Sequence, residues 1–305
     1  MTAQSFTSRS GFLFALSAFL IWGFMPLFWK LTDHIDPVEV TAHRALWSLP
    51  VAGIVLWSIG RTGDILPTLK SFRKLGILFV CSCLISANWG VFIWAVAVER
   101  TLETALAYYI NPLLTILLGF IFLGDRFSRL QLLAILIAAT AVLMLTIVGG
   151  EFPFLSIFLA ATFGIYGLLR KTVDVGPTQG FLIEILLIFP FVLVYVFWLE
   201  SSGTGLFFSG GMNWLLLALA GPATATPLIL YAFGAKRLRL STIGLMQFIV
   251  PTMLFLISIF VFGEPLQETQ LYAFIMIWIA LMLYAWSILR NEYNQKSHPL
   301  GKRMA

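Results

Sequence analysis

Two charged residues interrupt long apolar runs of this sequence, and they are the first candidates for chemistry. Arg44 lies in TAHRALWS (41–48), directly after His43, and Glu184 lies in FLIEILLIFP (181–190). A charged side chain at the centre of a membrane helix costs about 2.5 to 3.5 kcal/mol on insertion scales, so such residues are functional-site candidates by default. We therefore expect Arg44 and Glu184 to line a central cavity.

The sequence alone does not identify the groups that contact Arg44 and Glu184, and three arrangements are possible. Arg44 and Glu184 form a direct salt bridge, are linked by water or substrate, or stay apart with Glu184 protonated by desolvation. Arg44 lies about 10 Å inside the outer membrane boundary at a rise of about 1.5 Å per residue, so a snorkelling arginine is the structural alternative. A histidine side chain can titrate near neutral pH, so His43 is a candidate for proton coupling, with a purely structural histidine as its alternative.

Other polar side chains fall on helical stripes that suit a cavity for an organic solute. Amide side chains in hydrocarbon need hydrogen-bond partners, although ordinary bonding between helices explains each of them singly. Two prolines in LALAGPATATPLILY (217–231) predict a kink or hinge in that helix. The full set of expected cavity residues is Arg44, Glu184, His43, Asn88, Trp89, Tyr108, Asn111 and Gln247, with Pro222 and Pro227 as the hinge.

The elements that must hold these residues are membrane helices. Of the 305 residues, 60% are hydrophobic and 11% are charged, whereas soluble domains carry about 25% charged residues. Segments of about 20 apolar residues cross a bilayer as helices, and the period-2 alternation of a lipid-facing barrel is scarce. The fold class is therefore an all-α integral membrane protein with ten transmembrane helices, expected at 11–32, 37–59, 74–97, 102–123, 128–148, 152–171, 178–199, 212–235, 241–262 and 268–289.

The distribution of basic residues orients these spans. With the N-terminus inside, all of the 19 Lys and Arg residues except Lys30, Arg44 and Arg100 fall on the inner side. An excess of Lys and Arg in cytoplasmic loops is the normal pattern of membrane proteins. We therefore expect both termini to be cytoplasmic, with residues 1–10 and 290–305 as the tails.

The two halves of the chain resemble each other at an offset of 139 to 140 residues. YYINPLLTILLGFIFLGDRFS (108–128) aligns with QFIVPTMLFLISIFVFGEPLQ (247–267), and the two buried charges then correspond to one another. Five spans is an odd number, so the second half, 152–289, enters the membrane from the side opposite to the first half, 11–148. Inverted repeats of this kind are found in many secondary transporters, which hold their substrate near the midplane between the halves.

Several stretches carry a resemblance to a known family. They are FLIWGFMPLFWK (19–30), TAHRALWS (41–48), NWGVFIWAV (88–96), YYINPLLTILLGFIFLGDRF (108–127), YGLLRK (166–171), FLIE (181–184) and RLRLSTIGLMQFIVPTMLFL (237–256). Over nearly its whole length the chain resembles the RarD (chloramphenicol-sensitive protein) subfamily of EamA-type transporters, in the drug/metabolite transporter superfamily. The resemblance implies two inverted five-helix EamA repeats, at 11–148 and 152–289, and transport of a small organic solute across the plasma (cell inner) membrane.

Three classes of function compete, and the sequence favours transport. We expect a secondary transporter that works by alternating access without ATP, because the chain has no GxxxxGK[ST] phosphate-binding loop. An intramembrane enzyme would need a nucleophile–base pair or a metal cluster, and the sequence has neither HExxH nor GxSxG. A sensor or structural protein would usually bring a soluble effector domain. We expect no enzyme activity, no cofactor, no metal site and no nucleic-acid partner. The expected partners are lipid and an exported or exchanged solute, with protons as candidate coupling ion and a homodimer as candidate assembly.

Overall fold

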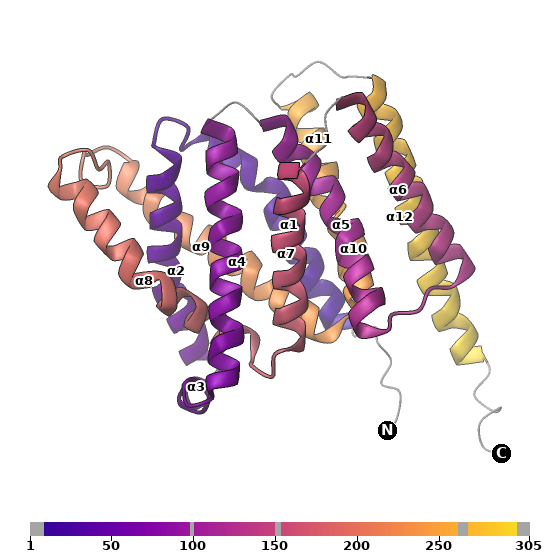
Figure 1. The fold of residues 1–305 in the computed structure, drawn as a ribbon, viewed down its shortest axis with the longest axis horizontal. Helices are drawn as coiled ribbons and strands as arrows, with labels where there is room; N and C mark the ends of the chain where they lie inside the picture. Colours follow the sequence, from indigo (N-terminus) through magenta and orange to yellow (C-terminus); the bar gives the residue numbers. More distant parts are fainter. Residues whose placement is uncertain (1–8, 98–100, 150–153, 262–267, 298–305) are drawn as a thin grey trace.

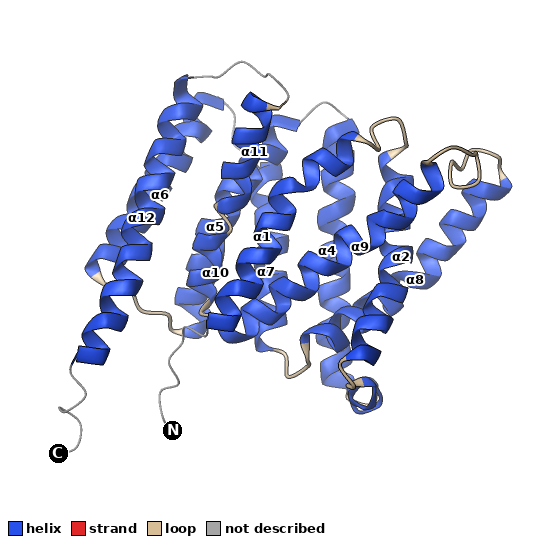
Figure 2. Cartoon of the chain, turned by 180° about the vertical axis from the view of Figure 1, so that it is seen from behind, coloured by secondary structure: helices blue, strands red, loops and turns tan. Residues whose placement is uncertain are grey.

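The computed structural model describes residues 9–97, 101–149, 154–261 and 268–297. These ranges consist of helices and connecting loops, with no β-strand among them (Figure 2). The helices are α1 (Arg9–Lys30), α2 (Pro37–Ser58), η1 (Thr62–Asp64), α3 (Ile65–Leu69), α4 (Phe72–Ala97), α5 (Thr101–Leu123), α6 (Arg129–Gly149), α7 (Phe154–Thr172), α8 (Pro177–Ser201), α9 (Asn213–Arg237), α10 (Leu240–Met246), α11 (Ile249–Phe260) and α12 (Glu268–Ser297).

Each of the ten expected segments contains a helix of the structure, with two differences. The expected helix at 241–262 is broken into α10 and α11 at Gln247 and Phe248. Pro251 has no N–H to donate to the carbonyl of Gln247, which instead accepts from Val250 at 3.1 Å. The stretch after α2, expected as a loop, forms η1 and α3, which together bend by 114° from α2.

Many of these helices are long and apolar enough to cross a membrane. Among the described residues seven single helices pass on length and hydropathy, and the bent pair that begins at Pro37 makes up to eight. Two shorter apolar helical stretches, Ala107–Leu123 and Leu271–Ser287, lie in α5 and α12. The chain is therefore a multi-pass membrane protein, and a full count of ten spans stays a prediction.

The two helices that carry the buried charges begin in the same way. Pro37 and Pro177 occupy the first turn of α2 and α8, where proline's missing N–H costs nothing and its fixed φ suits a helix. Before α2, the Asp36 carboxylate accepts the backbone N–H of Val38 at 2.7 Å. Arg44 and Glu184 each stand seven residues after the starting proline, so they occupy equivalent positions two turns into their helices.

Corresponding helices of the two halves pack on helices of the opposite half (Figure 1). Helix α1 packs on α9 and α11, and α7 packs on α4 and α5. Three further pairs, α2 with α8, α5 with α10, and α6 with α12, join one half to the other. Helices α6 and α12 form one end of the molecule and α8 the other, while the start of α1 and the end of α12 lie on the same side.

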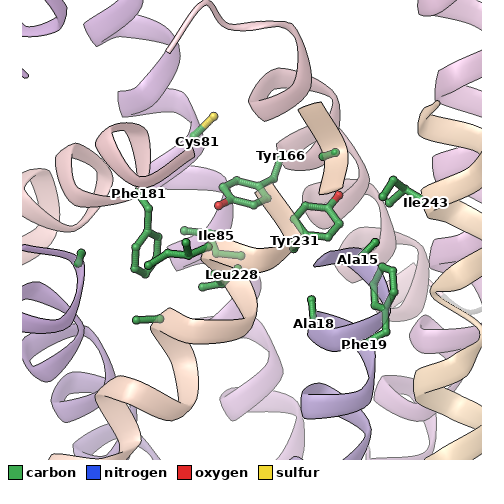
Figure 3. Packing of buried hydrophobic residues seen from close by; sticks show 14 of the residues in the cluster. Ala15, Ala18, Phe19, Cys81, Ile85, Tyr166, Phe181, Leu228, Tyr231 and Ile243 are labelled. Carbon is green, nitrogen blue, oxygen red and sulfur yellow. The ribbon is translucent and has the colours of Figure 1, made fainter. Parts of the chain in front are cut away.

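The centre of the bundle is an aromatic and aliphatic cluster (Figure 3). Tyr166 of α7 and Tyr231 of α9 lie at its middle, between Phe181 on one side and Phe19 on the other. Phe19 meets the Tyr231 ring edge-on, with centroids 6.1 Å apart. Because the same cluster surrounds the polar residues discussed next, it fixes the positions of their helices.

Candidate functional site

Arg44 is held between two tryptophan rings inside the bundle. Its guanidinium carbon lies 4.7 Å from the ring centroid of Trp29 and 4.9 Å from that of Trp89. Its Nε donates a hydrogen bond to Thr224 Oγ1 at 2.9 Å. These contacts come from α1, α4 and α9, so Arg44 joins both halves of the chain, and stacking on aromatic faces is a geometry that suits a guanidinium.

A glycine brings the Thr224 partner within reach of Arg44. A Cβ at Gly221 would lie 2.3 Å from the backbone carbonyl carbon of Trp47, so only glycine allows α9 to approach α2 this closely. Ser48 Oγ bridges the same contact, donating to the carbonyls of Arg44 and Gly221 at 2.5 and 3.1 Å. No carboxylate of the described residues lies within salt-bridge distance of Arg44, and its cationic charge is left to another partner.

Glu184 is paired with an arginine other than Arg44. Its Oε1 lies 3.4 Å from Arg170 Nε, and its Oε2 accepts from the Tyr166 hydroxyl at 3.2 Å. Both charges are buried, with Arg170 1% and Glu184 3% exposed. The direct salt bridge between Arg44 and Glu184, one of the three alternatives from the sequence, is therefore wrong.

Arg170 is the functional-site neighbour that sequence reasoning missed. It stands beside Lys171 at the end of an apolar run, which predicts a basic residue on the inner side of the membrane; the structure instead buries it. Its Nη2 donates to the carbonyl of Pro177 at 2.6 Å, and a Cβ at Gly180 would lie 1.8 Å from its Nη1. The one sequence signal was the repeat offset, which aligns Arg170 with Lys30.

The same alignment shows how the halves differ. Lys30, the counterpart of Arg170, is 67% exposed and pairs with Asp33 at 3.0 Å. Because Arg44 takes the place of Glu184 in the first half, two cations occupy the positions that hold an ion pair in the second half. At these positions the charges of Arg170 and Glu184 balance in the second half, whereas in the first half the Arg44 guanidinium has no carboxylate partner among the described residues.

Two spaces lie between α2, α4 and α8. The larger is a groove of about 440 Å³ lined by the N-terminal half of α2 and the C-terminal halves of α4 and α8, with Thr41, Ser86 and Tyr195 as polar members. The smaller, about 10 Å³, lies deeper and is lined by Ser48, Tyr166 and Glu184; it is the size of about one water molecule. Both share Ala45, Trp89 and Ile188 as wall residues. Trp89 therefore borders the groove and also contacts the Arg44 guanidinium, whereas Arg44 itself lines neither space.

The remaining expected residues lie in different parts of the bundle. Asn88 is satisfied by α7, donating to the Leu159 carbonyl and to Thr162 Oγ1 at 2.8 Å each, and it lines neither space. Tyr108 is 39% exposed and lies close enough to Arg44 to interact electrostatically.

A second polar group gathers at the break between α10 and α11. Thr115 Oγ1 lies 3.5 Å from Asn111 Oδ1 and 3.2 Å from Gln247 Oε1. Gln247 is buried, and its Nε2 has no hydrogen-bond partner. The structure thus brings Asn111 and Gln247 together, but on α5 and at the break between α10 and α11 rather than beside the groove.

The last three expected residues lie on α2 and α9. His43 is 1% exposed and stacks on Phe207 with centroids 4.9 Å apart, away from the groove lining. Pro222 and Pro227 lie inside one continuous helix, α9. No break marks a hinge there, and the hinge stays a prediction.

Polar contacts close the opposite end of the bundle, where α5, α7 and α9 end and α10 begins. Asp125 Oδ2 accepts from the Ser241 hydroxyl at 2.6 Å and from its backbone N–H at 3.0 Å. Lys171 Nζ donates to the carbonyls of Ala235, at 2.8 Å, and Leu238. The Asp125 bonds tie the first half to the second at the end away from the groove. The Lys171 bonds join α7 to the end of α9 within the second half.

The geometry defines a class of protein: a helical multi-pass membrane protein whose two halves enclose buried charges beside a groove. Comparison with known proteins then gives the family. The EamA-like transporter family matches residues 9–147. A transporter of Bacillus subtilis, YojE, described as uncharacterized, is 40% identical over 97% of this chain and 100% of its own length. Protein RarD of Escherichia coli is 40% identical over 93% of this chain and 97% of its own.

A solved structure agrees with this fold. A crystal structure titled only as that of a protein covers 92% of this chain and 99% of its own, with a TM-score of 0.72 at 16% identity. At that identity the likeness concerns the fold alone. On its relatives, the chain belongs to the RarD-type EamA transporters, a family of membrane transporters in the drug/metabolite superfamily.

Proposed function

We propose that the chain is a secondary transporter of a small organic solute with an anionic group, and that Arg44 binds this group. The observation that carries the proposal is the unpaired guanidinium of Arg44 one ring away from the groove. Its guanidinium carbon lies over the rings of Trp29 and Trp89 and its Nε is bonded to Thr224, so the Nη donors are the part that meets a ligand. These donors match a carboxylate or phosphate in a bidentate geometry.

We further propose that the structure is the state open to the outer side. The groove lies in the outer halves of α2, α4 and α8, and the bonds of Asp125 and Lys171 close the other end. The exchange of packing partners between the halves supports an inverted repeat over 11–148 and 152–289. Alternating access then follows if the halves swap conformations. In this scheme both termini are cytoplasmic and the membrane is the cell inner membrane.

A flux assay tests the proposed function. Purified full-length protein is reconstituted into liposomes, and uptake of labelled amino acids, organic acids, nucleosides and drug-like compounds is measured with and without a pH gradient. We expect at least one anionic solute to equilibrate faster than in protein-free liposomes. The proposal is contradicted if protein that is correctly inserted in the liposome membrane transports none of these solute classes, either with or without the pH gradient. A flux that depends on the pH gradient assigns protons as the coupling ion.

A further inference from the structure

An acidic and histidine-bearing cluster lies at the outer end of α2 and α8, apart from Arg44 and the groove. It consists of Glu39 and His43 of α2 and Glu200 of α8. Glu39 and His43 are four residues apart and share one helix face. The ligand-type atoms of the three side chains all lie within 4.8 Å of one another. The cluster therefore brings one nitrogen and two carboxylate groups to a single point.

His43 shows that this cluster is incomplete without a further group. It is 1% exposed, and neither ring nitrogen has a hydrogen-bond partner among the residues that the structure describes. A buried polar group without a partner is costly and rare in folded proteins. Its ring stacks on Phe207 at 8° between the planes, which fixes the direction in which its nitrogens point. One of them faces the two carboxylates.

The carboxylates are oriented by the loop that follows α8. Glu39 Oε1 accepts the backbone N–H of Leu206 at 2.7 Å, and Glu200 Oε1 accepts that of Phe207 at 3.2 Å. A Cβ at Gly205 would lie 2.5 Å from Glu200 Oε1, so a larger residue there would displace the Glu200 carboxylate. A backbone N–H thus holds each carboxylate through its Oε1, as hydrogen bonds from the outer shell orient the ligands of metal sites.

The two carboxylates of the cluster carry negative charge that a bound cation would neutralise. Glu39 is 1% exposed, and its charged neighbours Glu200 and Asp36 are both acidic. No lysine or arginine of the described residues pairs with Glu39 or Glu200. Buried charges are normally paired or coordinate a metal.

We propose that Glu39, His43 and Glu200 bind a divalent transition-metal ion, with Zn²⁺ as the best fit. Zn²⁺ accepts His nitrogen and Glu oxygen at about 2.0 to 2.2 Å and keeps a water as fourth ligand where the protein supplies three. Imidazole favours Zn²⁺ over the hard cations Mg²⁺ and Ca²⁺, which take oxygen ligands. The bound ion ties the outer ends of α2 and α8 to the loop carrying Phe207.

Isothermal titration of the full-length protein tests the site. The protein is purified in detergent, stripped with EDTA, desalted and titrated with ZnCl₂ alone. We expect one Zn²⁺ per chain, with at least tenfold weaker binding in His43→Gln and Glu200→Gln. The matched control is His34→Gln, because His34 is an exposed histidine in the preceding loop that bonds Asn213 at 2.8 Å. Its affinity for Zn²⁺ should stay within twofold of the parent.

Each other outcome overturns the proposal. These are no stoichiometric Zn²⁺ binding, equal binding of Mg²⁺, unchanged affinity in His43→Gln and Glu200→Gln, or loss of binding in His34→Gln. Since His43 is buried, Glu200→Gln at the half-buried helix end is the variant to rely on if His43→Gln does not fold. Co²⁺ provides a second readout in the parent protein. Its visible absorption should show nitrogen and oxygen ligation, and an aqua-ion spectrum would rule the site out.

Discussion

The buried pair of Arg170 and Glu184 gives the sharpest stability prediction. In Arg170→Met the Glu184 carboxylate keeps only the Tyr166 hydroxyl and loses the guanidinium 3.4 Å away. Removing one partner of a buried ion pair costs about 3 to 5 kcal/mol, because the other charge is left uncompensated. At about 2 to 4 °C per kcal/mol for a chain of this size class, the Tm should fall by about 10 °C.

A second substitution in the same background separates the charge effect from lost packing. In the double variant Arg170→Met with Glu184→Gln no buried charge is left unpaired, and replacing a whole buried pair by neutral groups is often close to neutral. The double variant still lacks the hydrogen bond to the Pro177 carbonyl, worth about 1.5 to 3 kcal/mol for a charged donor. We therefore expect it to recover part of the lost Tm.

The assay is tryptophan fluorescence during heating of full-length protein in nanodiscs, at one scan rate for all variants. Arg44→Gln is the comparison, because no carboxylate of the described residues pairs with Arg44 and none is left unpaired by the substitution. The Tm of Arg44→Gln should fall by less than half as much as that of Arg170→Met. An Arg170→Met protein with unchanged Tm, or a double variant less stable than the single one, would refute the reasoning.

Three further predictions concern helix contacts. Gly221→Ala should lower the Tm, since overpacking costs about 1 to 3 kcal/mol, whereas Gly76→Ala, with nothing within 4 Å of the added Cβ, should leave it equal or higher in the same heating assay. Ser241→Ala removes the hydroxyl bond to Asp125 and should cost about 1 kcal/mol or more, measured as a lower Tm and faster solute exchange if this end opens more readily. Trp89→Ala should reduce flux more than Trp89→Phe, which keeps a ring face; equal flux in both variants would contradict a role for the ring.

Much of the helix framework follows from the sequence because its signals are local. Apolar runs of membrane-spanning length are separated by turn residues, and the Asp36–Pro37 pair marks the start of α2 through its cap and fixed φ. Arg44, which is half-buried, and Glu184, which is buried, were visible as charges within such runs. The break before α11 was not, because hydropathy continues through Gln247 and Phe248. Pro251 alone does not mark a break, since Pro112 lies inside the unbroken α5.

The partners of the site residues depend on contacts between distant segments, which no local pattern records. Arg170 looks like a loop residue because it stands next to Lys171. In the structure its guanidinium instead lies against α8, where Gly180 has no Cβ to block it. Trp29 ends an apolar run and gave no sign that it would face Arg44. Glu200 joins His43 only because α8 packs on α2, so no zinc-binding spacing appears in the sequence.

The central claim is that the unpaired guanidinium of Arg44 binds the transported solute, and one comparison of flux tests it most directly. Initial rates are measured in proteoliposomes for the parent, Arg44→Gln, Arg44→Lys and the control Arg61→Gln, in which an exposed arginine paired with Asp64 at 2.8 Å is neutralised. We expect Arg44→Gln to lose at least tenfold in rate, Arg44→Lys to retain part of it and Arg61→Gln to match the parent. Full flux in Arg44→Gln at equal reconstitution would contradict the claim.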